Sequence, residues 1–251
     1  MTATEARITH DAGGLRLDIG CGSLKREGFL GVDILDVADY QCDIANQDLP
    51  FPDDSASHIF SSHCLEHIHP TQLGHVFREF TRVAKDGALL ELWHPFSMHR
   101  DAFIFDHKSF LNEEHYYHIA YRFPDHWEPI LGARWTLDEI RYSVEPRILV
   151  DLIQRGVDLD FAVNYLHSVV REIGAFVRVH KTPLVGEPPR FKRSLCDGRR
   201  DHVFRVLGRG PYAESVGVST AIAPMGVRVL MGFYARAAAR RLGFAATRRT
   251  P

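Results

Sequence analysis

The chain has 251 residues, of which 45% are hydrophobic and 25% charged, and its formal net charge is -2 with histidine neutral. This composition is typical of one elaborated globular domain, and it gives no indication of nucleic-acid binding. Four cysteines without Cys-x-x-Cys spacing predict neither structural zinc nor disulfides. No basic region followed by an apolar run opens the chain, and no run is long enough to cross a bilayer. We therefore expect a cytoplasmic enzyme.

The first recognisable element is the stretch 15–22. Leu15 to Ile19 is an apolar run broken only by Arg16 and Asp18, which predicts a buried parallel strand. The turn Gly20-Cys21-Gly22 follows, and a second strand over 29–34 contains Asp33. The glycines allow the backbone to approach a nucleotide-like ligand, and the acid accepts hydrogen bonds from ribose hydroxyls.

The connection between these two strands is short. Ten residues separate Gly22 from Asp33, whereas a dinucleotide-binding unit places its acid about 20 residues on, after a full helix. The segment has room for about one helical turn. A pyrophosphate-binding helix is therefore hard to build, and a cofactor without phosphates fits better than NAD or FAD.

The next elements continue an open α/β sheet. A short strand ends near Cys42 and enters a proline-rich loop, and the fourth strand covers 56–61. An amphipathic helix over 71–85 leads to the fifth strand, 88–93. Ligand sites lie at the carboxyl ends of such strands. We therefore expect His63 and His67, after strand four, and His94, after strand five, to lie near the ligand.

Taken together, these motifs resemble class I S-adenosylmethionine-dependent methyltransferases. The resemblance covers roughly residues 15–95, and its short connection resembles a compact methyltransferase-11-like subgroup often linked to glycan or small-molecule biosynthesis. It implies an α/β, Rossmann-like, seven-stranded and mostly parallel sheet with helices on both faces. The matching segments are Leu17 to Gly22, Gly31 to Asp33, Asp43-Ile44, Leu49 to Asp54, Ser62 to Ile68 and Arg78 to Gly87.

The resemblance also implies the cofactor, S-adenosylmethionine, and the product, S-adenosylhomocysteine. The residues that it assigns to the methionine end and the sulfonium are Asp18, Gly20, Cys21, Gly22, Ser62 and His63. The residues that it assigns to the ribose and adenine are Asp33, Ile34, Asp43 and Ile44. For each of the three acids the alternative is a solvated turn residue.

Histidines and aromatic residues are concentrated in the middle of the chain. Eleven of the fifteen histidines lie between His58 and His126. We expect residues 95–130 to leave the core as an aromatic cap over the acceptor. A neutral histidine has a suitable pKa to deprotonate an acceptor hydroxyl. His94 or His63 is the predicted base, with His67 third, and a structural role is the alternative for each.

A divalent metal is an alternative way to acidify the acceptor. The residues that could supply ligands are Asp101, Asp106, His107, Glu113, Glu114, His115 and His118. No recognised spacing such as His-Glu-x-x-His occurs among them. The sequence therefore predicts no metal site.

The second half is less regular. We expect a strand over 139–144, helices over 146–155 and 159–173, and strands over 175–180 and 202–207 that complete the sheet, the last one antiparallel. Residues 181–200 are expected to form a surface loop. The methyltransferase domain is predicted over 1–210. The extension 211–251 has the pattern of a basic amphipathic helix that packs on its own domain or on a twin subunit in a homodimer; membrane-surface contact is the alternative.

The predicted function is transfer of a methyl group to a hydroxyl, or less readily an amine, of a glycan, sugar or small metabolite. One alternative is a methyltransferase that acts on a protein or nucleic acid. The near-neutral charge argues against nucleic acid. A second alternative is a non-catalytic scaffold with the same fold. A scaffold, however, has no need of the full set of cofactor motifs.

Overall fold

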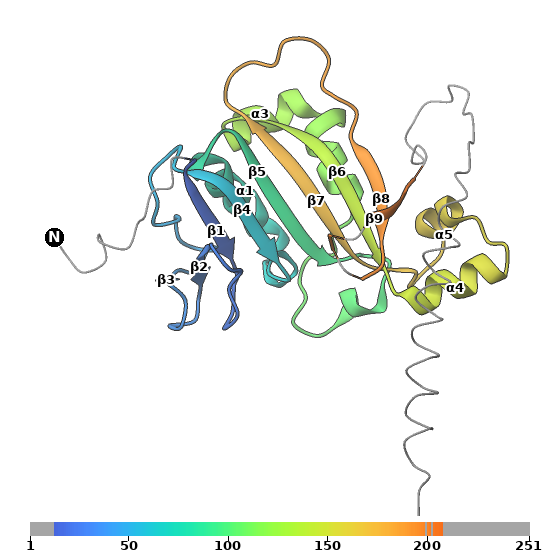
Figure 1. The fold of residues 1–251 in the computed structure, drawn as a ribbon. Helices are drawn as coiled ribbons and strands as arrows, with labels where there is room; N and C mark the ends of the chain where they lie inside the picture. Colours follow the sequence, from blue (N-terminus) through green and yellow to red (C-terminus); the bar gives the residue numbers. More distant parts are fainter. Residues whose placement is uncertain (1–12, 199, 202, 208–251) are drawn as a thin grey trace, which may run out of the picture.

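The computed structural model describes residues 13–198, 200, 201 and 203–207, which form one mixed sheet with helices packed against it (Figure 1). Within these residues the sheet has nine strands in the order β3-β2-β1-β4-β5-β7-β6-β8-β9. The strands are β1 (Leu15–Ile19), β2 (Leu30–Asp33), β3 (Tyr40–Gln41), β4 (Ala56–Ser62), β5 (Ala84–Pro95), β6 (Arg134–Val144), β7 (Val170–His180), β8 (Lys192–Cys196) and β9 (Val203–Val206).

Strands β1 to β5 run parallel, so their carboxyl ends meet at one edge of the sheet. Strand β7 lies antiparallel between β5 and β6. Strand β8 pairs parallel with β6, and β9 closes the sheet antiparallel to β8. The expected Rossmann-like sheet is confirmed, with two strands more than the seven expected. The sequence prediction made the last strand the antiparallel one, whereas β7 already runs antiparallel inside the sheet.

The helices lie mainly behind the sheet in the view of Figure 1. They are α1 (Pro70–Val83), α2 (Glu113–Tyr117), α3 (Pro124–Leu131), α4 (Pro146–Gln154) and α5 (Leu159–Tyr165), with 3-10 turns η2 (Leu65–His67) and η3 (Arg100–Phe103) and the π-helical turn η4 (His118–Arg122). Helix α1 buries Val76 and Phe80. Its proline at the first turn and the histidine cap before it fix where the helix begins.

The two faces of the sheet differ in chemistry because side chains alternate along each strand. The rear face carries buried apolar residues, such as Leu17 and Leu90. The front face carries charged and aromatic residues in cation–π contact: Arg26 lies over Phe60, and Arg141 over Phe176. Helices were expected on both faces, but no helix among the described residues crosses the front (Figure 1). The connection between β1 and β2 is too short to form a helix on the front face.

The insertion after β5 does not leave the core as a whole. Tyr116, Ile119 and Leu131 are buried, and Trp127 packs against the core, so α2, η4 and α3 belong to the rear helical layer. The loop before them is more exposed and carries Phe103 stacked on Phe110. Of the aromatic residues predicted to form a cap, Phe103, Phe105, Phe110 and Phe123 are exposed, and the cap itself stays a prediction.

The helix predicted over 159–173 is wrong in its second half. Helix α5 ends at Tyr165, and residues 170–180 form β7. Val169, Val170 and Ile173 have helical spacing, but pairing with both β5 and β6 favours the strand. The loop predicted over 181–200 contains β8, which begins at Lys192. The predicted extension 211–251 and its membrane, dimer or partner contacts lie outside the described residues.

In the part of the chain that the structure describes, no helix has the length and apolar character needed to span a membrane.

Gly174 provides a test of how closely β7 packs on β5. A Cβ added there would lie 2.5 Å from the ring of Trp93, which has no exposed surface. We expect Gly174→Ala to lower the free energy of unfolding by about 1–3 kcal/mol, since overpacking a rigid ring forces the strands apart. Gly74→Ala, in helix α1 with nothing within 4 Å, should instead raise it by about 0.5–1 kcal/mol. Urea denaturation measures both, and equal effects would contradict the packing.

Candidate cofactor and acceptor site

The turn after β1 presents backbone groups at the carboxyl edge of the sheet. Gly20 and Gly22 have φ angles of +71° and +55°, a region that favours glycine. A Cβ at Gly20 would also collide with the Cys64 side chain, whereas one at Gly22 would meet nothing within 4 Å. The Gly22 backbone is thus open on that side, and the amide of Gly20 is held by the Val32 carbonyl at 2.8 Å.

Asp33, at the end of β2, stabilises this turn through hydrogen bonds to its backbone. Its Oδ2 accepts a hydrogen bond from the Gly22 amide at 2.7 Å, and its Oδ1 accepts one from the Leu35 amide at 3.0 Å. A carboxylate has about four acceptor sites, so two remain for hydroxyl donors. Ile34 beside it is 64% exposed. The sequence prediction that Asp33 faces a ribose fits this placement.

Asp43 lies one connection further along the same edge. Its carboxylate accepts hydrogen bonds from the Ala45 amide and from Asn46 Nδ2, at 3.1 and 2.7 Å. The side chain therefore shapes a turn, as the alternative interpretation proposed, and it still has acceptor capacity for an adenine amino group. Ile44 is buried.

A cavity of about 410 Å³ opens beside the glycine turn. Four of the predicted cofactor residues line it: Asp18, Gly20, Cys21 and Ser62. Its other lining residues, Leu24, Arg26, Phe60, Glu91, Arg200 and Asp201, were not predicted. The other six predicted cofactor residues are not among the lining residues: Gly22, Asp33, Ile34, Asp43, Ile44 and His63. The structure thus brings together four of the six residues predicted for the methionine end and the sulfonium, whereas none of the residues predicted for the ribose and adenine lines this cavity.

Hydrogen bonds hold the charged side chains of this cavity in place. Asp18 is buried and accepts from the Arg26 amide at 2.6 Å; burial raises its pKa. The Arg26 guanidinium pairs with Glu91 at 2.8 Å. Burial alone would raise the pKa of Glu91, but hydrogen bonds from His58, Trp93 and Arg26 lower it to about 2. A buried carboxylate at Asp18 is suited to pair with a cationic amino group of a ligand.

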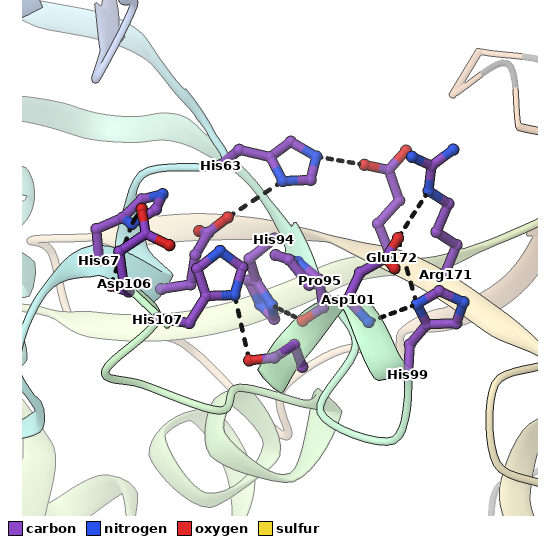
Figure 2. A network of polar contacts seen from close by, with 12 residues as sticks. His63, His67, His94, Pro95, His99, Asp101, Asp106, His107, Arg171 and Glu172 are labelled. Atoms are coloured by element: carbon purple, nitrogen blue, oxygen red, sulfur yellow. Dashed lines mark hydrogen bonds and ion pairs between the residues drawn. The ribbon is translucent and has the colours of Figure 1, made fainter. Parts of the chain in front are cut away.

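His63 follows β4 in a left-handed conformation, with φ of +54°. Its Nδ1 lies 3.1 Å from Glu66 Oε1, and its Nε2 lies 2.8 Å from Glu172 Oε2 (Figure 2). Carboxylates accept, so both ring nitrogens carry protons. The hydrogen bonds with Glu172 and then Glu66 raise the pKa of His63 to about 9, against the effect of burial. At neutral pH this geometry makes His63 a cation, which argues against the predicted role of base.

His94 is completely buried at the end of β5. Its Nδ1 donates to the Pro95 carbonyl at 3.0 Å, so its Nε2 accepts from the Tyr116 hydroxyl at 2.9 Å. Burial lowers the pKa of His94 to about 4. The ring lines neither of the two cavities described for this edge. This placement supports the structural alternative and does not support His94 as a base in contact with the acceptor.

The remaining predicted histidines are spread over the insertion. His67 is 41% exposed and lies beside His107, with ring centroids 4.8 Å apart. His115 caps α2 through Asn112, and His118 packs against Phe123. The candidate ligands considered from the sequence therefore do not converge as one set.

A second cavity, of about 360 Å³, adjoins the first. Most of its lining residues are polar or charged: Ser143, Glu145, Pro146, Arg147, Arg171, Glu172, Asp197 and Gly198. Arg200 of the first cavity and Glu172 of the second form an ion pair at 2.8 Å, so this pair is a wall between them. Burial alone would raise the pKa of Glu172, but hydrogen bonds from His63 and Arg200 lower it to about 2.

Sequence reasoning missed Arg26, Glu172 and Arg200. Arg26 stands in the short β1–β2 connection and could have been noticed as a cation beside the glycine turn. Glu172 and Arg200 have no motif around them, and they meet Ser62 and His63 only because β7 inserts next to β5.

Comparison of the chain with known proteins gave the following results. A family model described as a methyltransferase domain matches residues 17–92. No curated protein matches the chain at a significant level. Similar solved structures include a SAM-dependent methyltransferase from Archaeoglobus fulgidus, with 19% identity over 66% of this chain and 87% of that one and a TM-score of 0.47.

Two more solved structures are similar at the same level. A SAM-dependent methyltransferase from Methanosarcina mazei has 15% identity over 69% of this chain and 95% of that one, with a TM-score of 0.43. The YcgJ protein from Bacillus subtilis has 14% identity over 72% of this chain and 97% of that one, also with a TM-score of 0.43.

The residues at the carboxyl edge fit S-adenosylmethionine in chemistry. The buried Asp18 carboxylate suits the amino group, the open backbone at Gly22 allows close approach, and Asp33 has acceptor sites left for two hydroxyls. A cavity of about 410 Å³ is also within the usual size for a small-molecule site. The methyltransferase domain that the family model matches over residues 17–92, together with these residues, supports S-adenosylmethionine as the cofactor.

Proposed function

We propose that this methyltransferase methylates a hydroxyl, or less readily an amine, of a sugar or other small polar metabolite. The observation that carries the proposal is the pair of cavities whose lining residues Arg200 and Glu172 form an ion pair with each other. A cofactor in the first cavity has its reactive end near Ser62 and Arg200. An acceptor in the second cavity then lies across that wall.

The chemistry of the second cavity favours a polar acceptor. Carboxylates at Glu145, Glu172 and Asp197 and the hydroxyl of Ser143 suit the hydroxyl groups of a sugar, and two arginines suit an anionic substituent. An apolar acceptor would cover these charged and polar groups without offering them a hydrogen bond, which is costly. The cavity is also of a size for a small molecule or one glycan unit.

Methyl transfer from a sulfonium is an in-line displacement, and bound S-adenosylmethionine supplies the electrophilic methyl group. We assign the protein's main contribution to alignment of the acceptor with that methyl. His63, held between Glu66 and Glu172, fixes the loop after β4 at the wall. A protonated His63 cannot take a proton from the acceptor. In this proposal His63 and His94 are therefore positioning and structural residues, His67 is not required as a base, and the proton of the methylated hydroxyl passes to solvent water.

The experiment is an acceptor panel with release of S-adenosylhomocysteine as the readout. The panel contains monosaccharides, sugar acids, sugar phosphates, small amines, unfolded protein and RNA, each with the full-length chain. We expect turnover with a hydroxylated small molecule, and mass spectrometry should locate the new methyl on oxygen. Turnover only with protein or RNA would support the macromolecular alternative and overturn the proposal. Cofactor binding without turnover on any panel member would support a scaffold instead.

A further inference from the structure

The loop after β4 and the insertion after β5 bring together Glu66, His67 and His107. Each residue offers one ligand atom, and the three atoms lie within 4.8 Å of one another. None of the three lines either cavity, and the cluster meets the cofactor and acceptor site only through the contact of Glu66 Oε1 with His63 among the described residues. Figure 2 shows His67 and His107 together on one side of the polar network, away from Glu172.

Glu66 supplies an unsatisfied oxygen. The residue is 2% exposed, and its Oε1 accepts a hydrogen bond from His63 Nδ1. Its Oε2 is buried and has no hydrogen-bond partner among the described residues. A buried carboxylate oxygen without a partner is costly, and such groups in native proteins are commonly satisfied by water or an ion.

The two histidines are oriented as metal ligands usually are. His107 Nδ1 lies 3.2 Å from the Ala102 carbonyl, to which it donates. His67 Nδ1 lies 3.3 Å from the Asp106 carbonyl and 3.3 Å from an Asp106 carboxylate oxygen. A histidine whose Nδ1–H is donated to a carbonyl or carboxylate keeps its Nε2 lone pair for a metal. Simple packing of the His67 and His107 rings would explain their contact. It would still leave Glu66 Oε2 without a hydrogen-bond partner among the described residues.

We propose that Glu66, His67 and His107 bind a divalent transition-metal ion of the zinc type. Two imidazoles and one carboxylate are a donor set that suits zinc, and a fourth position stays open to water. A tetrahedral ion with ligand bonds of about 2.0–2.1 Å needs ligand atoms about 3.4 Å apart. The three ligand atoms lie within 4.8 Å of one another, and rotation of the half-exposed His67 and partly exposed His107 side chains brings them to the shorter separation.

The ion would fasten the insertion to the loop after β4. That junction is already organised: the Glu66 carbonyl accepts from the amides of Lys108 and Ser109 at 2.7 and 3.1 Å, and Ser109 Oγ donates to the Ile68 carbonyl at 2.6 Å. The backbone thus holds both histidines near Glu66 before any ion binds, which lowers the cost of assembling the site.

The test is titration of the full-length protein, first stripped with a chelator, with Zn²⁺ alone by calorimetry and with Co²⁺ by absorption. We expect one ion per chain and a cobalt spectrum without the charge-transfer band of a thiolate ligand. His107→Ala and His67→Ala should each weaken binding by at least about 10-fold. His126→Ala, which removes an exposed histidine from α3, should leave it unchanged.

Three results would overturn the proposal: no stoichiometric binding, unchanged affinity in both His107→Ala and His67→Ala, or a thiolate band in the cobalt spectrum. Circular dichroism of each variant separates loss of the site from loss of the fold. Because the readout is metal binding, its outcome is independent of whether an acceptor is found.

Discussion

Replacing Asp33 by alanine is expected to weaken binding of S-adenosylmethionine by at least about 100-fold, which corresponds to about 2.7 kcal/mol. The carboxylate is charged, and hydrogen bonds to a charged group contribute about 1.5–3 kcal/mol each. Its two remaining acceptor sites suit the two ribose hydroxyls. The alanine variant also releases the Gly22 amide, which Asp33 Oδ2 holds at 2.7 Å. Calorimetric titration with the cofactor measures the change.

Two further variants separate these effects. Asp33→Asn keeps an acceptor for the Gly22 amide but loses the charge, so its affinity should fall between those of the wild type and Asp33→Ala. Asp36→Ala removes an exposed acid from the same loop and should bind normally. Equal affinity of Asp33→Ala and Asp36→Ala would show that the ribose is not held at Asp33.

Acid is expected to destabilise the fold through His94. The ring has a pKa of about 4 in the folded protein because it is buried, against about 6.5 for an ordinary histidine. The unfolded chain therefore binds the proton more readily than the folded one. The stability that the neutral ring gives is complete above pH 6.5 and is lost as the pH falls towards 4. The loss amounts to about 3 kcal/mol.

The measurement is urea denaturation of the wild type and of His94→Gln at pH 7.5 and pH 4.5. Other groups titrate in this range, so the relevant quantity is the difference between the two proteins. His94→Gln should lose about 2–3 kcal/mol less than the wild type between the two pH values. His126→Ala, which removes a histidine at an exposed position, serves as the control variant. An identical pH dependence for His94→Gln would contradict a buried neutral ring.

The first half of the fold is predictable because its signals are local. The run from Leu15 to Ile19, the glycine turn and the helix beginning near Pro70 each carry a pattern within a few residues. The short connection before Asp33 also predicted correctly that no crossover helix fits there. The second half depends on pairing between distant strands. Val170 to Ile173 is compatible with helix or strand, and β5 and β6 on either side make it a strand.

The sequence predicts a site residue correctly only where the residue's position at the end of a strand determines where it lies in the fold. The order of motifs brings Asp18 and the glycine turn to the carboxyl edge, and the structure has them there. The sequence could not indicate which histidine is accessible. His63 and His94 both follow strands, but one is bridged by two carboxylates and the other is enclosed by α2. These contacts are distant in sequence, because Glu172 is 109 residues from His63 and Tyr116 is 22 residues from His94.

A structure of the full-length protein with bound S-adenosylhomocysteine tests the central claim most directly. We predict the amino acid end of the ligand in the cavity beside Asp18, the ribose on Asp33 and the sulfur near Ser62, facing the Arg200–Glu172 wall. A ligand bound elsewhere, or one whose sulfur points away from this wall, would contradict both the cofactor site and the assignment of the adjoining cavity to the acceptor.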